Sequence, residues 1–495
     1  MGALEKLKKR YRWISSFSSA LELLHWDMEV NMPPKGGKWR AKVIGTISEF
    51  VQRELTSDEM GKLLAEAERD AKGELDEALV RVAKRDYERS KKIPPELWGR
   101  FAEETAKAQR IWEEAKEKND FSLFAPQLKV VIEIVKEMAE RIGYEKSPYD
   151  ALLDFFEPGL TVEDLEEIIP PLRDFLKRAL RKIEAVEKPK DVFKGGPFEI
   201  EKQKELSLKV LKVMGYDLEA GRLDRSAHPF TITITHGDVR VTTRYDESDL
   251  KYSFFSTVHE GGHALYEQGI PEEMRGLPIG DGASMGIHES QSRFWENIVA
   301  RSLPFWEFFK TTLSEVFPQF ESVSAEDLWR SSNIVERSLI RTEADEVTYN
   351  LHIMLRYEIE KELIEGNMKV EEIPDVWKEK MEEYLGVIPK EDRDGALQDI
   401  HWAHGTFGYF PSYMMGNLYA AQLYSAMKRD LDFDSLVREG KFDKVLNWLR
   451  EKVHRYGRTL EPKELLRKAS GEDFKVDHFM DYIREKYSKV YGVSL

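Results

Sequence analysis

Two histidines and a glutamate in the middle of the chain have the spacing of a metal site. The segment reads His259, Glu260, Gly261, Gly262 and His263, and the apolar residues around it predict a helix. On a helix, residues i and i+4 lie on one face, so both imidazoles can bind one ion while Glu260 stands beside it. Each glycine costs roughly 1 kcal/mol of helix stability relative to alanine, so we expect close approach of another backbone or of the substrate here.

A third ligand has to come from another part of the sequence. The longer zinc-peptidase pattern would need glycine at position 266 and histidine at position 269, and Tyr266 and Gly269 exclude it. Our candidate is Glu289, at the start of the next predicted helix, and the alternatives are His288 and Asp281. Two histidines and one glutamate leave the fourth position open to water, as a catalytic zinc site requires and a structural zinc site does not.

Such a site predicts metal-assisted hydrolysis of a peptide bond. A catalytic zinc ion lowers the pKa of its water to about 7 and polarises a carbonyl oxygen. Glu260 then takes the proton of the water and passes it to the leaving amine. A non-catalytic scaffold held together by the metal is the alternative from another class of protein. Glu260 argues against the scaffold, because a purely structural site has no use for a base.

The composition limits the partners and the chemistry. The 495 residues include 75 basic and 91 acidic side chains, and the net charge of −16 argues against nucleic acid or an anionic membrane as a partner. The chain has no cysteine, so any metal must be held by histidines and carboxylates. With 41% hydrophobic residues the chain can bury a large core, and its high charge without cysteine suits a thermophilic protein.

The N-terminus shows no targeting signal that we can identify. Its basic start is followed by a serine-rich stretch with Glu22 instead of an apolar run, which argues against a signal peptide. Nowhere do about 18 apolar residues run together, so we expect no contact with a membrane. We therefore predict a cytoplasmic protein.

Helical patterns dominate the first part of the chain. Residues 1 to about 225 read as successive amphipathic helices, with apolar residues at helical spacing. Proline-containing joints at 32–34, 93–95 and 169–171 are predicted to separate these helices.

One segment breaks the helical pattern. Residues 230–235 alternate with period two, Gly237 and Asp238 offer a turn, and residues 239–245 alternate again. This pattern predicts a β-hairpin inside a helical protein. Helical character resumes at Ser253 and continues nearly to the end of the chain.

Four further motifs accompany the metal motif in a fixed order. They are DVRVT at 238–242, IRTEAD at 340–345, GALQDIHW at 395–402 and GYFPSY at 408–413. Together with the metal motif they resemble the carboxypeptidase Taq family of thermostable metallocarboxypeptidases. The resemblance extends from HWD at 25–27 to HRYGR at 454–458, and so covers essentially the whole chain.

The resemblance implies a mainly α-helical fold like those of neurolysin and angiotensin-converting enzyme. Such a fold has a deep substrate groove between helical halves and a small antiparallel β-sheet on the groove wall. We expect one catalytic fold over residues 1–495, with an N-terminal helical half (1–225) and a half that carries the hairpin, the metal site and the substrate-binding motifs (226–495). The resemblance also implies a homodimer with one zinc or cobalt ion per chain.

The activity that the resemblance implies is that of a metallocarboxypeptidase, which removes single residues from the C-termini of peptides with broad specificity. An oligopeptidase that cuts internal bonds of short peptides is the alternative within the same chemistry. A carboxypeptidase needs a free C-terminal carboxylate on its peptide substrate, whereas an oligopeptidase accepts a C-terminally amidated peptide.

Two motif arginines, Arg240 and Arg341, are candidates for binding that carboxylate. A guanidinium group is planar and permanently charged, which suits recognition of a carboxylate. A structural salt bridge is the alternative role for each of them, with Asp238 for the first arginine and Asp345 for the second.

The oxyanion of the tetrahedral intermediate needs a hydrogen-bond donor. In the related groove peptidases a histidine precedes such a tyrosine by a similar interval, which points to His401 and Tyr413 as catalytic residues. Tyr409 and His404 are near enough to compete for the assignment. Packing in the core is the alternative role for both tyrosines.

Tyr409, Gln398 and Asp399 are the remaining candidates for substrate binding, and the last two could also orient His401. We expect the other histidines to pack in the core or lie at the surface. These are His25, His228, His236, His352, His454 and His478.

Overall fold

Helices dominate the computed structural model, which describes residues 2–495, and the predicted mainly helical fold class is confirmed. Met1, the first residue of the predicted catalytic fold, lies outside the described residues. The α-helices are α1 (Ala3–Val30), α2 (Gly37–Leu55), α3 (Asp58–Asp70), α4 (Glu74–Lys92), α5 (Pro95–Lys118), α6 (Phe121–Ile142), α7 (Pro148–Phe156), α8 (Val162–Glu184), α9 (Ile200–Met214), α10 (Leu250–Gly269), α11 (Met285–Arg293), α12 (Leu303–Val316), α13 (Ala325–Ser332), α14 (Tyr349–Glu365), α15 (Ile373–Leu385), α16 (Phe410–Asp430), α17 (Phe433–Arg438), α18 (Phe442–Lys452), α19 (Pro462–Ser470) and α20 (Asp477–Tyr491). Within residues 2–495, no helix has the length and apolar character needed to cross a membrane.

The chain folds into two compact units, each built from three separate segments. Unit 1 comprises Met1–Ser90, Lys190–Ser332 and Tyr419–Phe474, and unit 2 comprises Lys91–Pro189, Asn333–Leu418 and Lys475–Leu495. Both predicted sequence halves, 1–225 and 226–495, contribute segments to each unit. The single catalytic fold over residues 1–495 stays a prediction.

Unit 1 contains a three-stranded sheet made of β1 (Leu223–Arg225), β2 (Thr231–Thr235) and β3 (Asp238–Thr243), in the order β1-β3-β2. Strands β2 and β3 pair antiparallel, which confirms the predicted hairpin. Strand β1 pairs with β3 in parallel, so the sheet is mixed and the prediction of an antiparallel sheet is wrong in this respect. The three residues of β1 are too few to show the alternation by which a strand is recognised in a sequence.

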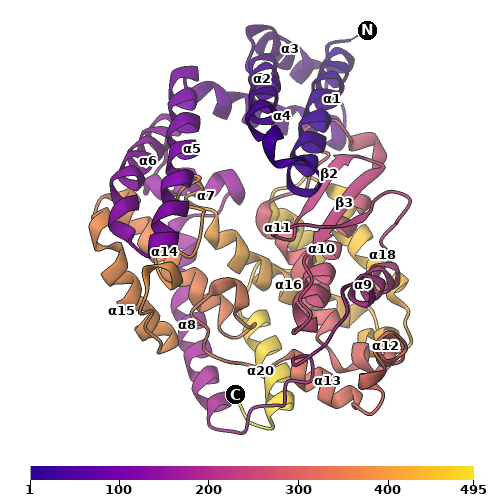
Figure 1. Ribbon diagram of the computed structural model, residues 1–495. Coiled ribbons are helices and arrows are strands. Elements are labelled where there is room, and N and C mark those ends of the chain that lie inside the picture. The colour runs from indigo at the N-terminus through magenta and orange to yellow at the C-terminus, as the bar shows by residue number, and fades with distance from the viewer. Residues whose placement is uncertain (1) are drawn as a thin grey trace. The chain divides into compact units, whose positions relative to one another are not determined.

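Helix α10, which carries the metal motif, packs against β2 and β3 of this sheet (Figure 1). The carboxylate of Asp249 caps the helix by accepting a hydrogen bond from the backbone nitrogen of Lys251 at 2.9 Å. Helices α9 and α11 pack against other sides of α10. The metal motif is therefore held by the sheet and two helices in unit 1.

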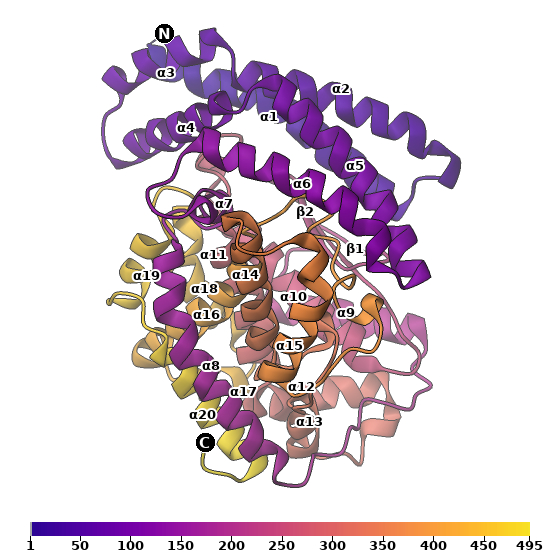
Figure 2. The same cartoon turned by 90° about the vertical axis from the view of Figure 1, so that its left-hand side faces the viewer.

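Unit 2 is built around packed helices. Helices α5 and α6 lie side by side (Figure 2), and between them Asn119 adopts the left-handed conformation while Asp120 caps α6. The cluster of Ile93, Leu97 and Ile134 fills part of the core. Helix α14 is buried on nearly all sides and carries charged side chains inside the unit.

Two of the predicted proline joints are confirmed, because α1 ends before the prolines at 33–34 and α5 begins at Pro95. The joint predicted at 169–171 is wrong, because α8 continues through Pro170 and Pro171. A capping box of Thr161 and Asp164 starts this helix, and its leucines, isoleucines and Phe175 bury one continuous apolar face. Burial of that face outweighs the hydrogen bonds that the prolines remove.

Candidate metal centre

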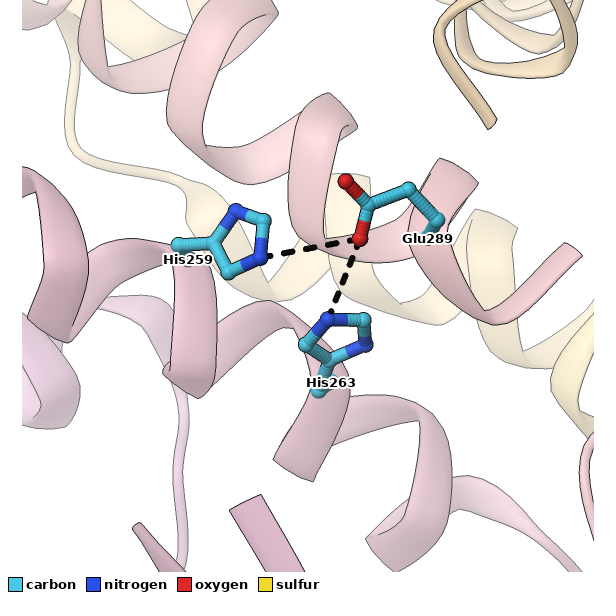
Figure 3. A group of neighbouring side chains, drawn as sticks. All are labelled: His259, His263 and Glu289. Atoms are coloured by element: carbon cyan, nitrogen blue, oxygen red, sulfur yellow. Dashed lines mark ion pairs between the residues drawn. The ribbon is translucent and has the colours of Figure 1, made fainter. Parts of the chain in front are cut away.

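The ligand atoms of His259, His263 and Glu289 converge on one point of unit 1. Nε2 of His259 lies 3.6 Å, and Nε2 of His263 lies 3.3 Å, from Oε2 of Glu289 (Figure 3). All the candidate ligand atoms lie within 4.8 Å of one another. Ligands about 2.0–2.2 Å from a tetrahedral zinc ion are roughly 3.3–3.6 Å apart. The three side chains therefore fit a divalent ion bound between them.

Glycines allow α11, which carries Glu289, to approach α10 closely. A Cβ atom at Gly262 would lie 2.6 Å from Cα of Ser292, so only glycine fits between the two helices. A Cβ atom at Gly261 would lie 2.7 Å from Cδ2 of Leu211 on α9. Close packing of neighbouring helices therefore accounts for both glycines of the metal motif.

A buried carboxylate orients His259. Nδ1 of His259 lies 2.9 Å from Oε2 of Glu296, which belongs to the π-helix η3 (Phe294–Ala300) directly after α11. Burial raises the pKa of Glu296, but Arg293, the hydrogen bond with His259 and Arg301 together hold it well below its usual range. The ionised carboxylate can only accept a hydrogen bond, so Nδ1 carries the proton and the lone pair of Nε2 faces the ligand cluster.

Glu289 is fixed by two residues of its own helix. Nε of Arg293 donates to Oε1 at 2.7 Å, and the hydroxyl of Ser292 donates to Oε2 at 3.0 Å. Burial raises the pKa of Glu289, but Arg293 and then His259 outweigh burial and hold it well below its usual value. Glu289 is therefore an ionised carboxylate with Oε2 turned toward the two histidines.

The two alternative ligands are placed differently. Nδ1 of His288 lies 2.6 Å from Nδ1 of His263, and its Nε2 lies 3.0 Å from Oε1 of Glu267. Asp281 is exposed in the loop before α11. Neither alternative belongs to the group of converging ligand atoms found within residues 2–495.

Glu260 lies next to the ligand cluster and is anchored to the sheet. Its side chain is buried, and its Oε2 accepts a hydrogen bond from the hydroxyl of Thr231 on β2 at 2.6 Å. Burial raises the pKa of Glu260, against the opposing effect of His259. A carboxylate with a raised pKa is a more effective proton acceptor near neutral pH.

Arg240 on β3 forms a salt bridge with Asp238. This is the structural role that we considered as the alternative to binding the substrate carboxylate. Nε and Nη2 of the arginine donate to the two oxygens of Asp238 at 2.7 and 2.6 Å. The guanidinium lies 4.2 Å from the ring centroid of Trp26 on α1, which gives this motif tryptophan a role that the sequence did not reveal. Nη1 of Arg240 takes no part in this bidentate pair, so it can donate to a further acceptor.

Arg341 lies in a buried ionic cluster of unit 2. Its Nε and Nη2 donate to Oδ1 of Asp399 at 3.0 and 2.8 Å, and its Nη1 donates to the hydroxyl of Tyr349 at 3.0 Å. Arg356 donates to Oδ2 of Asp399 at 2.7 Å and to Oε1 of Gln398 at 2.7 Å. The two arginines share one carboxylate, so this cluster has an excess of positive charge.

Asp345 is not the partner of Arg341, so the salt bridge considered for this pair is absent. Its carboxylate accepts hydrogen bonds from the backbone nitrogens of Val347 and Thr348 at 2.9 and 3.1 Å. The backbone nitrogen of Glu336 donates to the other oxygen at 3.1 Å. Asp345 therefore fixes the loop that leads into α14.

His401 and Tyr413 are neighbours in unit 2, with Nε2 of the histidine 3.3 Å from the tyrosine hydroxyl. Burial lowers the pKa of His401 to about 4, so the imidazole is neutral at pH 7. The ring of Tyr409 lies 5.0 Å from that of Tyr413 and 5.0 Å from that of Phe156. His404 has a different neighbour, because its Nε2 lies 3.4 Å from Oε1 of Gln109.

Comparison with known proteins decides the family. A family model described as carboxypeptidase Taq (M32) metallopeptidase matches residues 6–487. The chain belongs to this family. It is 45% identical over 483 residues to "Carboxypeptidase 1" of Bacillus subtilis, covering 97% of this chain and 96% of that protein. It is 42% identical over 489 residues to "Thermostable carboxypeptidase 1" of Pyrococcus furiosus, covering 98% of each.

The fold agrees with the family. A crystal structure of an M32 carboxypeptidase from Deinococcus radiodurans has a TM-score of 0.97 at 34% identity, covering 99% of this chain and 100% of that one. The protein is thus a metallocarboxypeptidase that hydrolyses peptides with a divalent metal ion.

Several residues around the metal centre of this M32 carboxypeptidase were not found from the sequence. Thr231, Glu296 and Arg293 all contact a residue of the metal motif or its candidate ligand. A partial signal exists, because Glu289, Arg293 and Glu296 follow one another at spacings of four and three residues, as on one helix face. Nothing in the sequence links Thr231 to Glu260.

Proposed function

We propose that His259, His263 and Glu289 hold the catalytic metal of this carboxypeptidase, one zinc ion per chain, with cobalt as a substitute. The observation that carries the proposal is the convergence of two Nε2 atoms and one carboxylate oxygen within 4.8 Å. Two imidazoles and a carboxylate suit zinc and cobalt, and three protein ligands leave a position for the reactants. When bound, the ion supplies a Lewis acid for the scissile carbonyl and activates water.

Glu260 is the general base in this proposal. Its carboxylate takes a proton from the water as the water oxygen bonds to the scissile carbonyl carbon. It then delivers that proton to the nitrogen of the leaving amino acid as the C–N bond breaks. Thr231 holds one carboxylate oxygen, which supports a fixed orientation of the base. Burial of the side chain supports its capacity to accept a proton.

The free carboxylate of the substrate is bound by arginine in the proposed mechanism. Arg341 is the leading candidate, because it shares the single carboxylate of Asp399 with Arg356 and the cluster has unbalanced positive charge. Arg240 is the second candidate, since its Nη1 is not used in the bidentate bond to Asp238. A guanidinium in either position favours a peptide with a free C-terminus.

His401 and Tyr413 are proposed to stabilise the oxyanion of the tetrahedral intermediate. A neutral imidazole and a phenol are both hydrogen-bond donors that need no charge of their own. The hydrogen bond between them supports a common role, and Tyr409, Gln398 and Asp399 are proposed to line or support the substrate site.

Further parts of the proposal rest on the family resemblance alone. They are the deep neurolysin-like groove, the homodimer and the broad specificity. The cytoplasmic location rests on the sequence pattern described above, and the thermostability rests on the resemblance together with the high charge without cysteine. Sedimentation of the purified protein measures the homodimer directly.

One pentapeptide in three forms tests the proposed activity. The free, N-acetylated and C-amidated peptides are incubated with zinc-loaded, cobalt-loaded and chelator-treated enzyme, and products are followed by mass spectrometry. We expect stepwise loss of C-terminal residues from the free and acetylated forms only, and no cleavage after chelation. Internal cleavage of the amidated peptide would contradict the carboxypeptidase mechanism.

Glu260→Gln tests the role of the base. The variant should bind one zinc ion per chain and lose turnover by at least about 10²–10⁴-fold, the usual contribution of a general base. Zinc content is measured by atomic absorption alongside the kinetics. Normal turnover of this variant would assign the base to another residue.

A further inference from the structure

The two candidate histidine ligands have different partners behind them. His259 contacts a carboxylate directly, because its Nδ1 lies 2.9 Å from Glu296. Behind His263 there is a second imidazole, with Nδ1 of His288 at 2.6 Å from Nδ1 of His263. A carboxylate comes next, because Oε1 of Glu267 lies 3.0 Å from Nε2 of His288.

The direction of the hydrogen bonds in this chain follows from its last member. The carboxylate of Glu267 accepts hydrogen bonds from Arg275 and Thr233 at its other oxygen, so Nε2 of His288 is the donor in the contact with Oε1. With its proton on Nε2, His288 can accept a hydrogen bond at Nδ1 from Nδ1 of His263. Nε2 of His263 is therefore the nitrogen with the lone pair, and it is the atom 3.3 Å from Oε2 of Glu289.

The far end of the chain is anchored in unit 1. The second oxygen of Glu267, Oε2, accepts hydrogen bonds from Nη1 of Arg275 at 3.1 Å and from the hydroxyl of Thr233 on β2 at 3.1 Å. Glu267 is buried and lies on α10, one turn after His263. The sheet and α10 therefore hold the carboxylate at a fixed distance from the imidazoles.

Packing also restricts the ring of His288. A Cβ atom at Gly282 would lie 2.8 Å from Cδ2 of His288. The ring of Tyr266 lies 5.1 Å from that of His288 on another side. These contacts limit rotation of the ring, so its two nitrogens stay directed at His263 and Glu267.

We infer that His288 and Glu267 form a hydrogen-bonded relay that sets the tautomer and orientation of His263 for metal binding. The inference rests on the metal ligands proposed above. His288 is then a positioning residue that tunes the affinity of the site for the metal, rather than a ligand. Partners of this kind typically change metal affinity by 10–100-fold when they are removed.

Zinc affinity of the purified full-length protein tests the relay. The dissociation constant is measured at pH 7 by competition with a chromophoric chelator for the parent, His288→Leu and His288→Gln. We expect His288→Leu to weaken zinc binding about 10–100-fold. His288→Gln should recover part of the loss, because an amide oxygen can accept from His263 and the amide nitrogen can donate to Glu267. Cobalt-loaded His288→Leu should also show altered ligand-field absorption.

His454→Leu is the matched control. This histidine is buried, its ring lies 5.1 Å from that of Tyr266, and its Nε2 lies 2.9 Å from Oε1 of Gln291. The control removes a nearby buried imidazole whose hydrogen bond goes to Gln291 rather than to His288 or Glu267, and it should bind zinc as the parent does. Equal weakening by both leucine variants would mean general loosening of the fold and would overturn the relay.

A further variant separates the relay from the metal site itself. If His263→Ala loses zinc binding but His288→Leu binds zinc as tightly as the parent, the relay is wrong and the metal site stands. If His263→Ala binds zinc as the parent does, the proposed ligand set is wrong, and the relay is overturned with it.

Discussion

The hydroxyl of Thr231 lies 2.6 Å from Oε2 of Glu260 and 2.9 Å from the backbone carbonyl oxygen of the same residue. One β-strand residue therefore contacts both the side chain and the backbone of the proposed base. The single hydroxyl proton serves one acceptor at a time, and both acceptors belong to the first turn of the metal motif. This contact ties the position of the base to the sheet.

Thr231→Val should lower kcat about tenfold with little change in KM. The substitution keeps the shape of the side chain but removes a hydrogen bond to a charged group, which is worth about 1.5 kcal/mol at least. Steady-state kinetics with a free peptide measure the effect. Thr231→Ser, which keeps the hydroxyl, is the control and should stay close to the parent. A kcat of the valine variant equal to that of the parent would show that Glu260 needs no support from β2.

Gly262→Ala should weaken zinc binding and destabilise the protein by about 1–3 kcal/mol. The added methyl group would meet the backbone of Ser292 at 2.6 Å and push α11 with Glu289 away from α10. Gly261→Ala is the matched variant, because its methyl group meets the flexible side chains of Leu211 at 2.7 Å and Met214 at 3.0 Å.

The two alanine variants are compared by zinc competition and by thermal unfolding. We expect the effect at Gly261 to be small, because the gain of about 1 kcal/mol in helix propensity offsets part of the crowding. Similar zinc affinities for both variants would argue that close packing of α10 and α11 does not set the position of Glu289.

Arg341→Gln should weaken hydrolysis of a peptide with a free C-terminus. A charge-assisted hydrogen bond is worth about 1.5–3 kcal/mol, so kcat/KM for the free peptide should fall about 10–100-fold. The C-amidated peptide should not be cleaved by the parent or by the variant. Arg240→Gln, assayed in the same way, shows which arginine binds the carboxylate. A kcat/KM of Arg341→Gln for the free peptide equal to that of the parent would exclude that residue.

Glu360 should make the stability of unit 2 depend on pH. This carboxyl is fully buried on α14 and accepts hydrogen bonds from Tyr149, Trp402 and the backbone of Gly408 at 2.5, 2.8 and 2.9 Å. Burial raises its pKa to about 7, although those hydrogen bonds oppose the rise. In the unfolded chain the group titrates near 4.5, so between pH 4.5 and pH 7 the folded state binds more protons.

The free energy of unfolding should therefore fall as the pH rises through this window. The contribution of Glu360 to the loss between pH 5 and pH 8 is about 2–3 kcal/mol. Urea unfolding of the parent and of Glu360→Gln at both pH values measures it, because the glutamine variant lacks the titrating group. An equal change in the two proteins would contradict a raised pKa at this position.

The sequence by itself determined the features that depend on neighbours along the chain. His259 and His263 are four residues apart, so helix geometry alone places them on one face. The hairpin of β2 and β3 follows from period-two alternation around a turn, and this hairpin was predicted correctly. The family motifs added the class of activity, because several motifs in one order occur together over nearly the whole chain.

Only the tertiary structure decided which distant residues meet. Arg341 pairs with Asp399, which is 58 residues away in the chain, and not with Asp345, the partner considered from the sequence. The parallel pairing of β1 with β3 and the uninterrupted α8 likewise depend on burial against other segments. Local patterns carry no information on such contacts.

The physical reason lies in the energetics of burial. A buried charge has to find a partner wherever the fold supplies one, so the partners of His259 and Glu260 are set by the packing of η3 and β2 against α10. Residue spacing fixes the geometry within one helix. The position of each helix and strand relative to the others follows from the shape of the whole core, which no short segment encodes.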